Sequence, residues 1–186
     1  MIITISGMPG SGKTTVARML SERLKLKHYY MGGIRRKVAE ERGITLNELN
    51  ALGEKDPESD RLVDDMLVKL GKTEDNFIAE GRTASHFIPH SIKLFIAVDI
   101  KEGARRIRDD VKLKGNKRNE EIRENISEMV ALLDKRIASD KVRYKKYYNI
   151  DIFDPEMYDL WIDTTDMTPE QVVDQILAYI EENQCS

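Results

Sequence analysis

Cysteine is nearly absent from this sequence, since Cys185 is the only one among 186 residues. A single thiol excludes an intrachain disulfide and a cysteine-rich zinc site. Long apolar runs are also missing: none approaches the 18 residues that a membrane-spanning helix needs. Residues 1–6 run straight into glycines and are too short for the core of a signal peptide. We therefore expect a cytoplasmic protein with no membrane partner.

The sequence also lacks a large net charge. Its 30 Lys and Arg residues against 33 Asp and Glu residues give −3 at pH 7, which argues against a general nucleic-acid surface. The basic stretch 112–117 is diluted by acidic neighbours and predicts a solvated segment. Hydrophobic residues make up 40% of the chain and charged residues 34%, a balance typical of a folded domain with a charged surface. We expect residues 1–186 to form one domain and a monomer.

Two periodicities alternate along the chain. Short runs of β-branched and aromatic residues predict strands, and apolar residues at helical spacing predict helices between them. Because strands and helices alternate, we expect a three-layer α/β/α fold with a five-stranded parallel sheet. The capping pair Thr45 and Glu48 predicts one helix start, and Gly115-Asn116 predicts a break. The expected strands are 2–6, 27–31, 77–79, 94–98 and 160–162, and the expected helices begin near 14, 34, 45, 57, 101 and 168.

A phosphate-binding loop lies directly after the first expected strand. It has the complete pattern G-x-x-x-x-G-K-T and opens an amphipathic helix, which is the context that this loop requires. Glycines let backbone N–H groups surround an anion, the lysine reaches the outer phosphates, and the threonine hydroxyl binds Mg²⁺. We expect ATP and Mg²⁺ here, held by Gly7, Met8, Pro9, Gly10, Ser11, Gly12, Lys13, Thr14 and Thr15.

Charged residues later in the chain suit a second phosphorylated ligand. Glu80 ends an expected strand at the sheet edge where ligands bind, and it can hold Mg²⁺ through water or orient Arg82. Arg136, Asp140 and Arg143 are spaced by four and three residues, which places them on one helix face. Arginine binds phosphate with a planar, permanently charged fork. The pattern indicates transfer of a phosphoryl group between two bound molecules.

Islands of sequence spread over nearly the whole chain resemble the nucleoside monophosphate kinases, and within them the archaeal-type cytidylate kinases. The phosphate loop is shared by many families, so the later islands carry the finer assignment. They keep the order of the family. These islands are 3–15, 32–36, 41–43, 56–60, 80–82, 143–144, 148–152, 158–160 and 163–164.

The resemblance implies transfer of the γ-phosphate of ATP to CMP or dCMP, giving ADP and CDP or dCDP. It implies a monophosphate-binding insertion over about 32–72 and a lid over about 106–148. Arg36 and Arg82 are expected at the acceptor phosphate, with Lys13, Arg106, Arg136 and Arg143 completing the catalytic set. The other expected acceptor-site residues are Asp60, Glu80, Gly81 and Asp140.

Four positions depart from the family pattern. Met31 and Gly33 stand where a small polar and a polar or acidic residue are common, and Asp110 and Ile137 alter the lid. These departures leave other acceptors open: AMP, UMP or a small hydroxylated metabolite such as a sugar acid. A regulatory protein that binds ATP without transferring phosphate is a second alternative, although it would leave the arginines unused. An RNA-binding protein would need a more basic surface.

Overall fold

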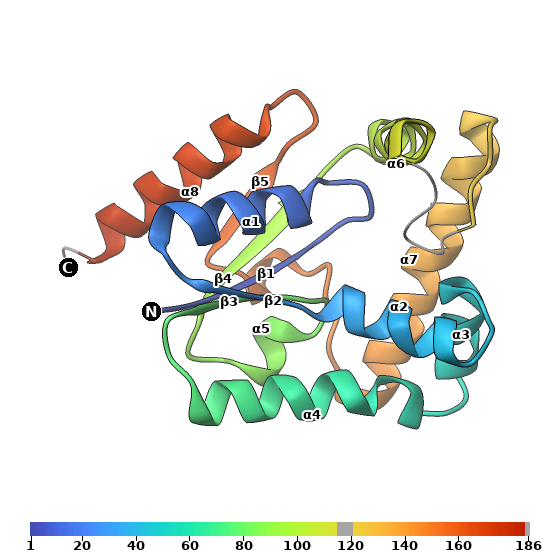
Figure 1. The fold of residues 1–186 in the computed structure, drawn as a ribbon, viewed down its shortest axis with the longest axis horizontal. Helices are drawn as coiled ribbons and strands as arrows, with labels where there is room; N and C mark the ends of the chain where they lie inside the picture. Colours follow the sequence, from blue (N-terminus) through green and yellow to red (C-terminus); the bar gives the residue numbers. More distant parts are fainter. Residues whose placement is uncertain (115–120, 185–186) are drawn as a thin grey trace.

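A computed structural model describes residues 1–114 and 121–184, and it shows a layered α/β structure (Figure 1). The expected strands and helices are present with bounds that differ by a few residues. The strands are β1 Ile2–Gly7, β2 Lys27–Tyr30, β3 Phe77–Glu80, β4 Ile92–Ala97 and β5 Leu160–Asp163. The helices are α1 Lys13–Leu24, α2 Met31–Glu41, α3 Leu46–Gly53, α4 Glu58–Thr73, α5 Ala84–Phe87, α6 Ile100–Lys114, α7 Ile126–Tyr148 and α8 Pro169–Gln184, with a 3-10 turn, η1 Pro155–Met157.

The five strands form one parallel sheet in the order β2-β3-β1-β4-β5. The strand order reverses beside β1, the central strand, because the chain goes first to β2 and β3 on one side and then to β4 and β5 on the other. Ligands of such sheets bind beyond the carboxyl ends of the strands at this reversal point. The phosphate loop, which follows β1, lies at that edge in Figure 1.

Each face of the sheet has its own apolar core. On one face, alternate strand residues such as Ile3, Ile5 and Ile96 pack with α1 and α8. On the other, Phe77 and Ala79 pack with α2, α4 and α5. Successive side chains along a strand point to opposite faces of the sheet, so the near-continuous apolar runs of these parallel strands contribute residues to both cores. Figure 1 shows α1 and α8 on one side of the sheet, α4 and α5 on the other, and α2, α3, α6 and α7 beyond the strand ends.

A third, smaller core joins α6 to α7 and contains Ala104, Ile107, Met129 and Leu133. These two helices therefore pack on each other through side chains that the two sheet cores do not use. The capping box at Thr45 and Glu48 is present as predicted, with Glu48 N at 3.2 Å from Thr45 Oγ1 and Thr45 N at 2.7 Å from Glu48 Oε2.

The elements differ from the sequence prediction in two ways. The expected strand 27–31 ends at Tyr30, because Met31 begins α2 three residues earlier than its apolar pattern indicated. The short α5 and η1 were not predicted, since neither is long enough to show a periodicity. The expected break at Gly115-Asn116, part of the basic stretch 112–117, and Cys185 lie outside the described residues.

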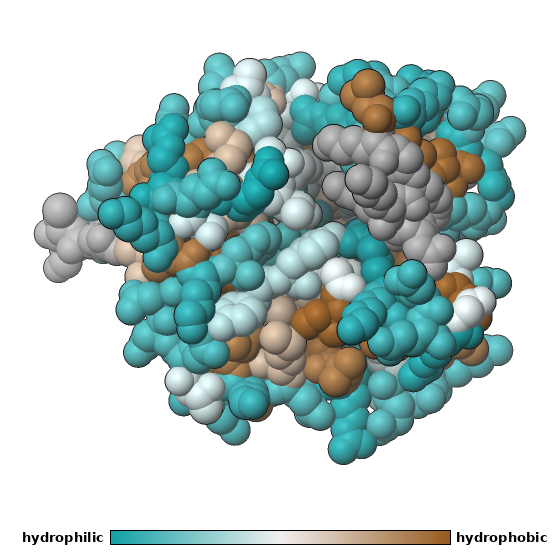
Figure 2. Space-filling model, viewed as in Figure 1, coloured by the Kyte–Doolittle hydropathy of each residue, from teal (hydrophilic) through white to brown (hydrophobic). Residues whose placement is uncertain are grey.

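Hydrophilic residues cover most of the face shown in Figure 2, as the charged composition predicts, and apolar side chains are exposed in several small areas, one of them between α2 and α4. Within residues 1–114 and 121–184, every helix is too short or too polar to cross a membrane.

Candidate functional site

A cavity of about 310 Å³ lies beyond the carboxyl ends of the strands. It is bounded by the phosphate loop and α1 on one side and by α2, α4, α6 and α7 on the others. Most of the residues predicted for the site line it, although Gly7, Met8 and Ser11 do not. The predicted residues in its lining are Pro9, Gly10, Gly12, Lys13, Thr14, Thr15, Arg36, Asp60, Glu80, Gly81, Arg82, Arg106, Arg136, Asp140 and Arg143.

The phosphate loop has the backbone of an anion cradle. Gly10 and Gly12 adopt φ values of 77° and 83°, which side chains other than glycine rarely allow. The loop ends where α1 begins at Lys13, so the first N–H groups of the helix face the same space. Lys13 Nζ donates to Met8 O at 2.5 Å and to Ser11 Oγ at 3.4 Å. The ammonium group is therefore held folded over the loop.

The loop touches α6 through bare backbone. A Cβ added at Gly10 would lie 2.3 Å from Gly103 O, and one added at Gly103 would lie 2.7 Å from Pro9 O. Three residues further along α6, Arg106 donates to Thr164 O at 2.7 Å and to Thr165 O at 3.0 Å and pairs with Glu102 at 2.8 Å. The first turns of α6 are thus tied both to the phosphate loop and to the segment after β5.

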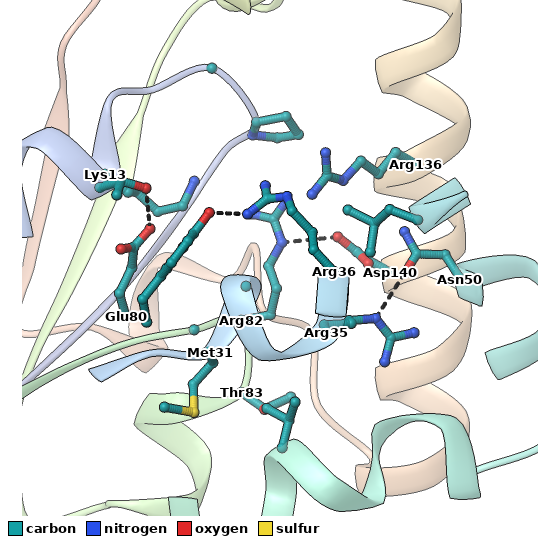
Figure 3. A pocket seen from close by; sticks show the side chains of 18 of the residues that line it. Lys13, Met31, Arg35, Arg36, Asn50, Glu80, Arg82, Thr83, Arg136 and Asp140 are labelled. Atoms are coloured by element: carbon teal, nitrogen blue, oxygen red, sulfur yellow. Dashed lines mark hydrogen bonds and ion pairs between the residues drawn. The ribbon is translucent and has the colours of Figure 1, made fainter. Parts of the chain in front are cut away.

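The two residues predicted to bind the metal meet directly. Thr14 Oγ1 donates to Glu80 Oε1 at 2.7 Å, the contact drawn at Glu80 in Figure 3. The second carboxylate oxygen of Glu80 lies 3.2 Å from His28 Nε2. Glu80 is the last residue of β3 and is 4% exposed. A hydroxyl and a carboxylate at this spacing match the partial protein ligand set with which Mg²⁺ binds nucleotide phosphates, the rest being water and substrate oxygens.

Arginines and carboxylates alternate along the opposite wall. Asp140 accepts from Arg143 Nη2 at 2.6 Å and lies 3.0 Å from Arg82 Nε. Asp60 pairs with Arg35 and lies 3.6 Å from Arg143 Nη1. Asn50 Oδ1 accepts from Arg35 Nε at 3.0 Å and from Arg143 Nη1 at 3.2 Å. The result is one network that joins α2, α3, α4 and α7 to the end of β3.

This network is buried, and its two carboxylates are paired with three arginines. Arg143 is 1% exposed, Asp140 2% and Asp60 4%. Burial opposes ionisation of Asp140, but the neighbouring positive charges, chiefly Arg82 and Arg143, hold the pKa of its carboxyl below the usual value. Burial also acts against the charge of Arg143, yet its pKa is raised, because Tyr144, Asp140 and Asp60 favour the cation. Both groups therefore stay charged at neutral pH.

Arg36 is held by an aromatic ring. Its Nη1 donates to the hydroxyl of Tyr30, and its guanidinium carbon lies 5.4 Å from the Tyr30 ring centroid. The ring lies across the first turn of α2, where a Cβ added at Gly33 would be 2.8 Å from Tyr30 Cδ1 and one at Gly32 would be 3.0 Å from Tyr30 Cε2. The glycine at position 33, a departure noted in the sequence, makes room for this ring.

A carboxylate without an arginine hydrogen bond lies on the inner side of α4. Asp64 lines the cavity, accepts from Thr83 Oγ1 at 3.3 Å, and accepts from the Tyr148 hydroxyl. Burial raises the pKa of Asp64 to about 6, helped by the nearby charge of Asp60 and opposed by the two hydroxyl donors and by Arg35. Asp64 thus differs from Asp60 and Asp140, which are both paired with guanidinium groups.

The structure brings nearly all of the predicted site residues around one cavity, and Figure 3 shows Lys13, Glu80, Arg82, Arg136 and Asp140 facing the same space. Among the lining residues that the sequence did not predict for the site are five with polar side chains that contact the predicted ones or each other. The helical spacing of Asp60 and Asp64 was the one signal that pointed to any of them. The missed residues are Tyr30, Arg35, Asn50, Asp64 and Thr83.

Comparison with known proteins supports a family assignment. The model of the cytidylate kinase-like family matches residues 2–166. A cytidylate kinase of Methanothrix thermoacetophila is 43% identical over 164 residues, which is 88% of each chain. A cytidylate kinase of Pyrococcus furiosus is 36% identical over 182 residues, covering 97% of this chain and 88% of the relative. The similarity therefore includes the phosphate loop and both walls of the cavity.

Solved structures with low sequence identity share the fold. A protein of uncharacterised function from Eubacterium ventriosum superposes with a TM-score of 0.70 at 22% identity, covering 97% of this chain and 98% of the other. Shikimate kinase from Acinetobacter baumannii superposes with a TM-score of 0.60 at 16% identity, covering 100% and 95%. These likenesses show that the chain shares the fold of these proteins.

Proposed function

The chain belongs to the cytidylate kinase-like family, and from that premise we propose that it transfers the γ-phosphate of ATP to CMP or dCMP, giving ADP and CDP or dCDP. It is a nucleoside monophosphate kinase. The observation that carries the proposal is a single cavity with a complete phosphate loop at one end and an arginine-carboxylate wall at the other. Such a wall suits a second anionic nucleotide, whose phosphate is itself the nucleophile.

On the donor side, the backbone N–H groups of residues 7–15 and the Lys13 ammonium would hold the ATP phosphates. Mg²⁺ would be bound by the Thr14 hydroxyl and, directly or through water, by Glu80, whose contact at 2.7 Å supports this pairing. When bound, the ion neutralises charge between the outer phosphates and orients them. No protein base is needed, because a phosphate oxygen attacks as an anion.

On the acceptor side, Arg36 and Arg82 would hold the phosphate of CMP. Arg106, Arg136 and Arg143 would neutralise charge as transfer proceeds, with Asp140 orienting the guanidinium groups of Arg82 and Arg143. Residues 32–72 are proposed as the acceptor-binding insertion and residues 106–148 as a lid. The separate core between α6 and α7 supports the second assignment, because it packs these two helices into one unit distinct from the sheet cores.

A panel of acceptors tests the function. With ATP and Mg²⁺ and coupled detection of ADP, we expect CMP or dCMP to give the highest kcat/KM among CMP, dCMP, UMP, AMP and shikimate. Removal of Mg²⁺ with a chelator should stop ADP formation. A higher kcat/KM for AMP, UMP or shikimate would replace the proposed acceptor. ATP binding with no acceleration of ADP formation by any of these acceptors would leave only the regulatory alternative.

The contact between Tyr30 and Arg36 gives a prediction on acceptor affinity. Tyr30→Phe removes the hydroxyl that accepts from Arg36 while keeping the ring. The net value of one such bond is about 1 kcal/mol, so Kd for CMP should rise about fivefold and Kd for ATP should stay the same. Titration calorimetry with each nucleotide measures both values. Equal weakening of ATP and CMP would show that Tyr30 does not act through the acceptor site.

We also propose a monomer in the cytoplasm. The monomer is supported by a cavity whose phosphate loop and arginines all come from one chain. The location is supported by the single cysteine of the sequence, which fits a reducing compartment.

A further inference from the structure

The cavity lining contains acidic side chains with very different partners. Asp60 and Asp140 are paired with guanidinium groups, and Glu80 is engaged by Thr14 and His28. Asp64 instead receives hydrogen bonds from hydroxyl groups, those of Thr83 and Tyr148. Each carboxylate oxygen can accept more than one hydrogen bond, so Asp64 keeps acceptor capacity that faces the cavity.

The position of Asp64 separates it from the phosphate chemistry. Thr83, which donates to Asp64, follows Arg82 in the chain, and in Figure 3 Arg82 lies between Lys13 and Thr83. A monophosphate held by Arg82 would direct the rest of the nucleotide away from the phosphate loop. Asp64 and its two hydroxyl donors lie on that far side, on α4, after β3 and at the end of α7.

We propose that Asp64 selects the acceptor base by accepting a hydrogen bond from the exocyclic amino group of cytosine. This inference rests on the proposed function and assigns a base-recognition residue to it. Cytosine presents an amino donor at the 4-position, whereas uracil presents a carbonyl oxygen there. The Asp64 carboxylate accepts a hydrogen bond from the amino group of cytosine and repels the carbonyl oxygen of uracil.

Three further observations agree with this role. The hydroxyls of Thr83 and Tyr148 fix the carboxylate, so a base meets an acceptor that is already oriented. Although burial raises the pKa of Asp64 to about 6, its carboxyl is mostly ionised at pH 7 and accepts rather than donates. Arg35, whose charge also acts on Asp64, has a buried Nη2 with no hydrogen-bond partner among the described residues. That nitrogen is a donor suited to the ring N3 or O2 of cytosine.

The test is the ratio of kcat/KM for CMP to kcat/KM for UMP. Asp64→Asn keeps the shape of the side chain but offers either a donor or an acceptor to the base. We expect the ratio to fall at least about tenfold, since a site that hydrogen-bonds one group discriminates through that bond. Asp64→Ser, measured in the same way, should also lower the ratio. Thermal melting of each variant confirms that it is folded.

Asp65→Asn is the matched control, because Asp65 is the next residue of α4 and its side chain is 73% exposed in an ion pair with Arg61. It should leave the ratio unchanged. If the wild-type protein turns over CMP and both Asp64 variants keep its CMP to UMP ratio within about twofold, the inference is overturned and the proposed function stands. If the wild-type protein does not use CMP, the proposed function itself fails and the inference fails with it.

Discussion

Replacing Lys13 with alanine should lower kcat for CMP phosphorylation on the order of 10³-fold while leaving the fold intact. Lys13 Nζ already lies over the phosphate loop, 2.5 Å from Met8 O, so its charge is positioned before any nucleotide binds. Phosphoryl transfer depends on positioning and charge stabilisation, and this ammonium is the donor nearest in sequence to the phosphate-binding amides. Initial rates with saturating ATP and CMP give the value of kcat.

The matched control is Lys72→Ala, because Lys72 is an exposed residue near the end of α4. It should change kcat by less than about twofold, as expected for a surface substitution away from the site. Circular dichroism and thermal melting report whether either variant has lost its fold. A folded Lys13→Ala protein with near-wild-type turnover would contradict the assignment of this loop as the donor site.

The largest expected effect on stability comes from Arg143→Met. Arg143 is 1% exposed and holds Asp140 at 2.6 Å and Asp60 at 3.6 Å. Its removal takes one of two guanidinium partners from each of the buried carboxylates Asp140 and Asp60, and breaking a buried ionic network in this way costs about 3–5 kcal/mol. Because a domain of this size is stabilised by only about 5–15 kcal/mol, the variant should unfold at much lower denaturant concentration. Urea denaturation followed by circular dichroism measures the loss.

Arg61→Met provides the comparison. Arg61 lies on α4, and its side chain is 64% exposed beside Glu58 and Asp65. Exposed ion pairs contribute about 0–1 kcal/mol, so the free energy of unfolding of this variant should be close to that of the wild type. If both variants lose the same small amount of unfolding free energy, the Arg143 network does not stabilise the fold. Activity measured well below the unfolding transition then separates any direct role of Arg143 in transfer from its structural role.

The phosphate loop could be predicted from sequence because all of its determinants are local. Glycine spacing, Lys13 and Thr14 lie within eight residues, after a strand and before a helix. The alternation of strands and helices likewise predicted the parallel sheet, since each period reflects which side of the element is buried. The strand-end position of Glu80 was enough to place it at the ligand edge, and its contact with Thr14 agrees.

The acceptor wall was harder to predict because its contacts join distant segments. Arg35 and Arg36 are adjacent on α2, yet Arg35 contacts Asp60 and Arg36 contacts Tyr30. Nothing in the local pattern says which arginine faces which neighbour. Asp64 depends on a hydrogen bond from Tyr148, 84 residues away. The four-residue spacing puts Asp60 and Asp64 on one face of α4, but their separate roles follow from partners on other elements.

Arg143 illustrates the same limit. Its spacing from Asp140 correctly predicted that the two side chains share a face of α7 and meet. The resemblance implied a position in a lid over the triphosphate, whereas the structure buries the residue against Asn50 and Asp60. Packing of α3 and α4 on α7 causes this burial, and no short stretch of sequence encodes that packing.

The backbone contact between the phosphate loop and α6 restricts which residues can occupy positions 10 and 103 during evolution. A methyl group at Gly10 would lie 2.3 Å from Gly103 O, and one at Gly103 would lie 2.7 Å from Pro9 O. Neither glycine can therefore be replaced unless the phosphate loop and α6 move apart. A glycine inside a helix costs about 1 kcal/mol of stability relative to alanine. Substitution of Gly103 would therefore be favoured during evolution if the contact did not require glycine. We therefore expect glycine at positions 10 and 103 to be conserved together, so that Gly103 extends the phosphate-loop motif to a residue on α6.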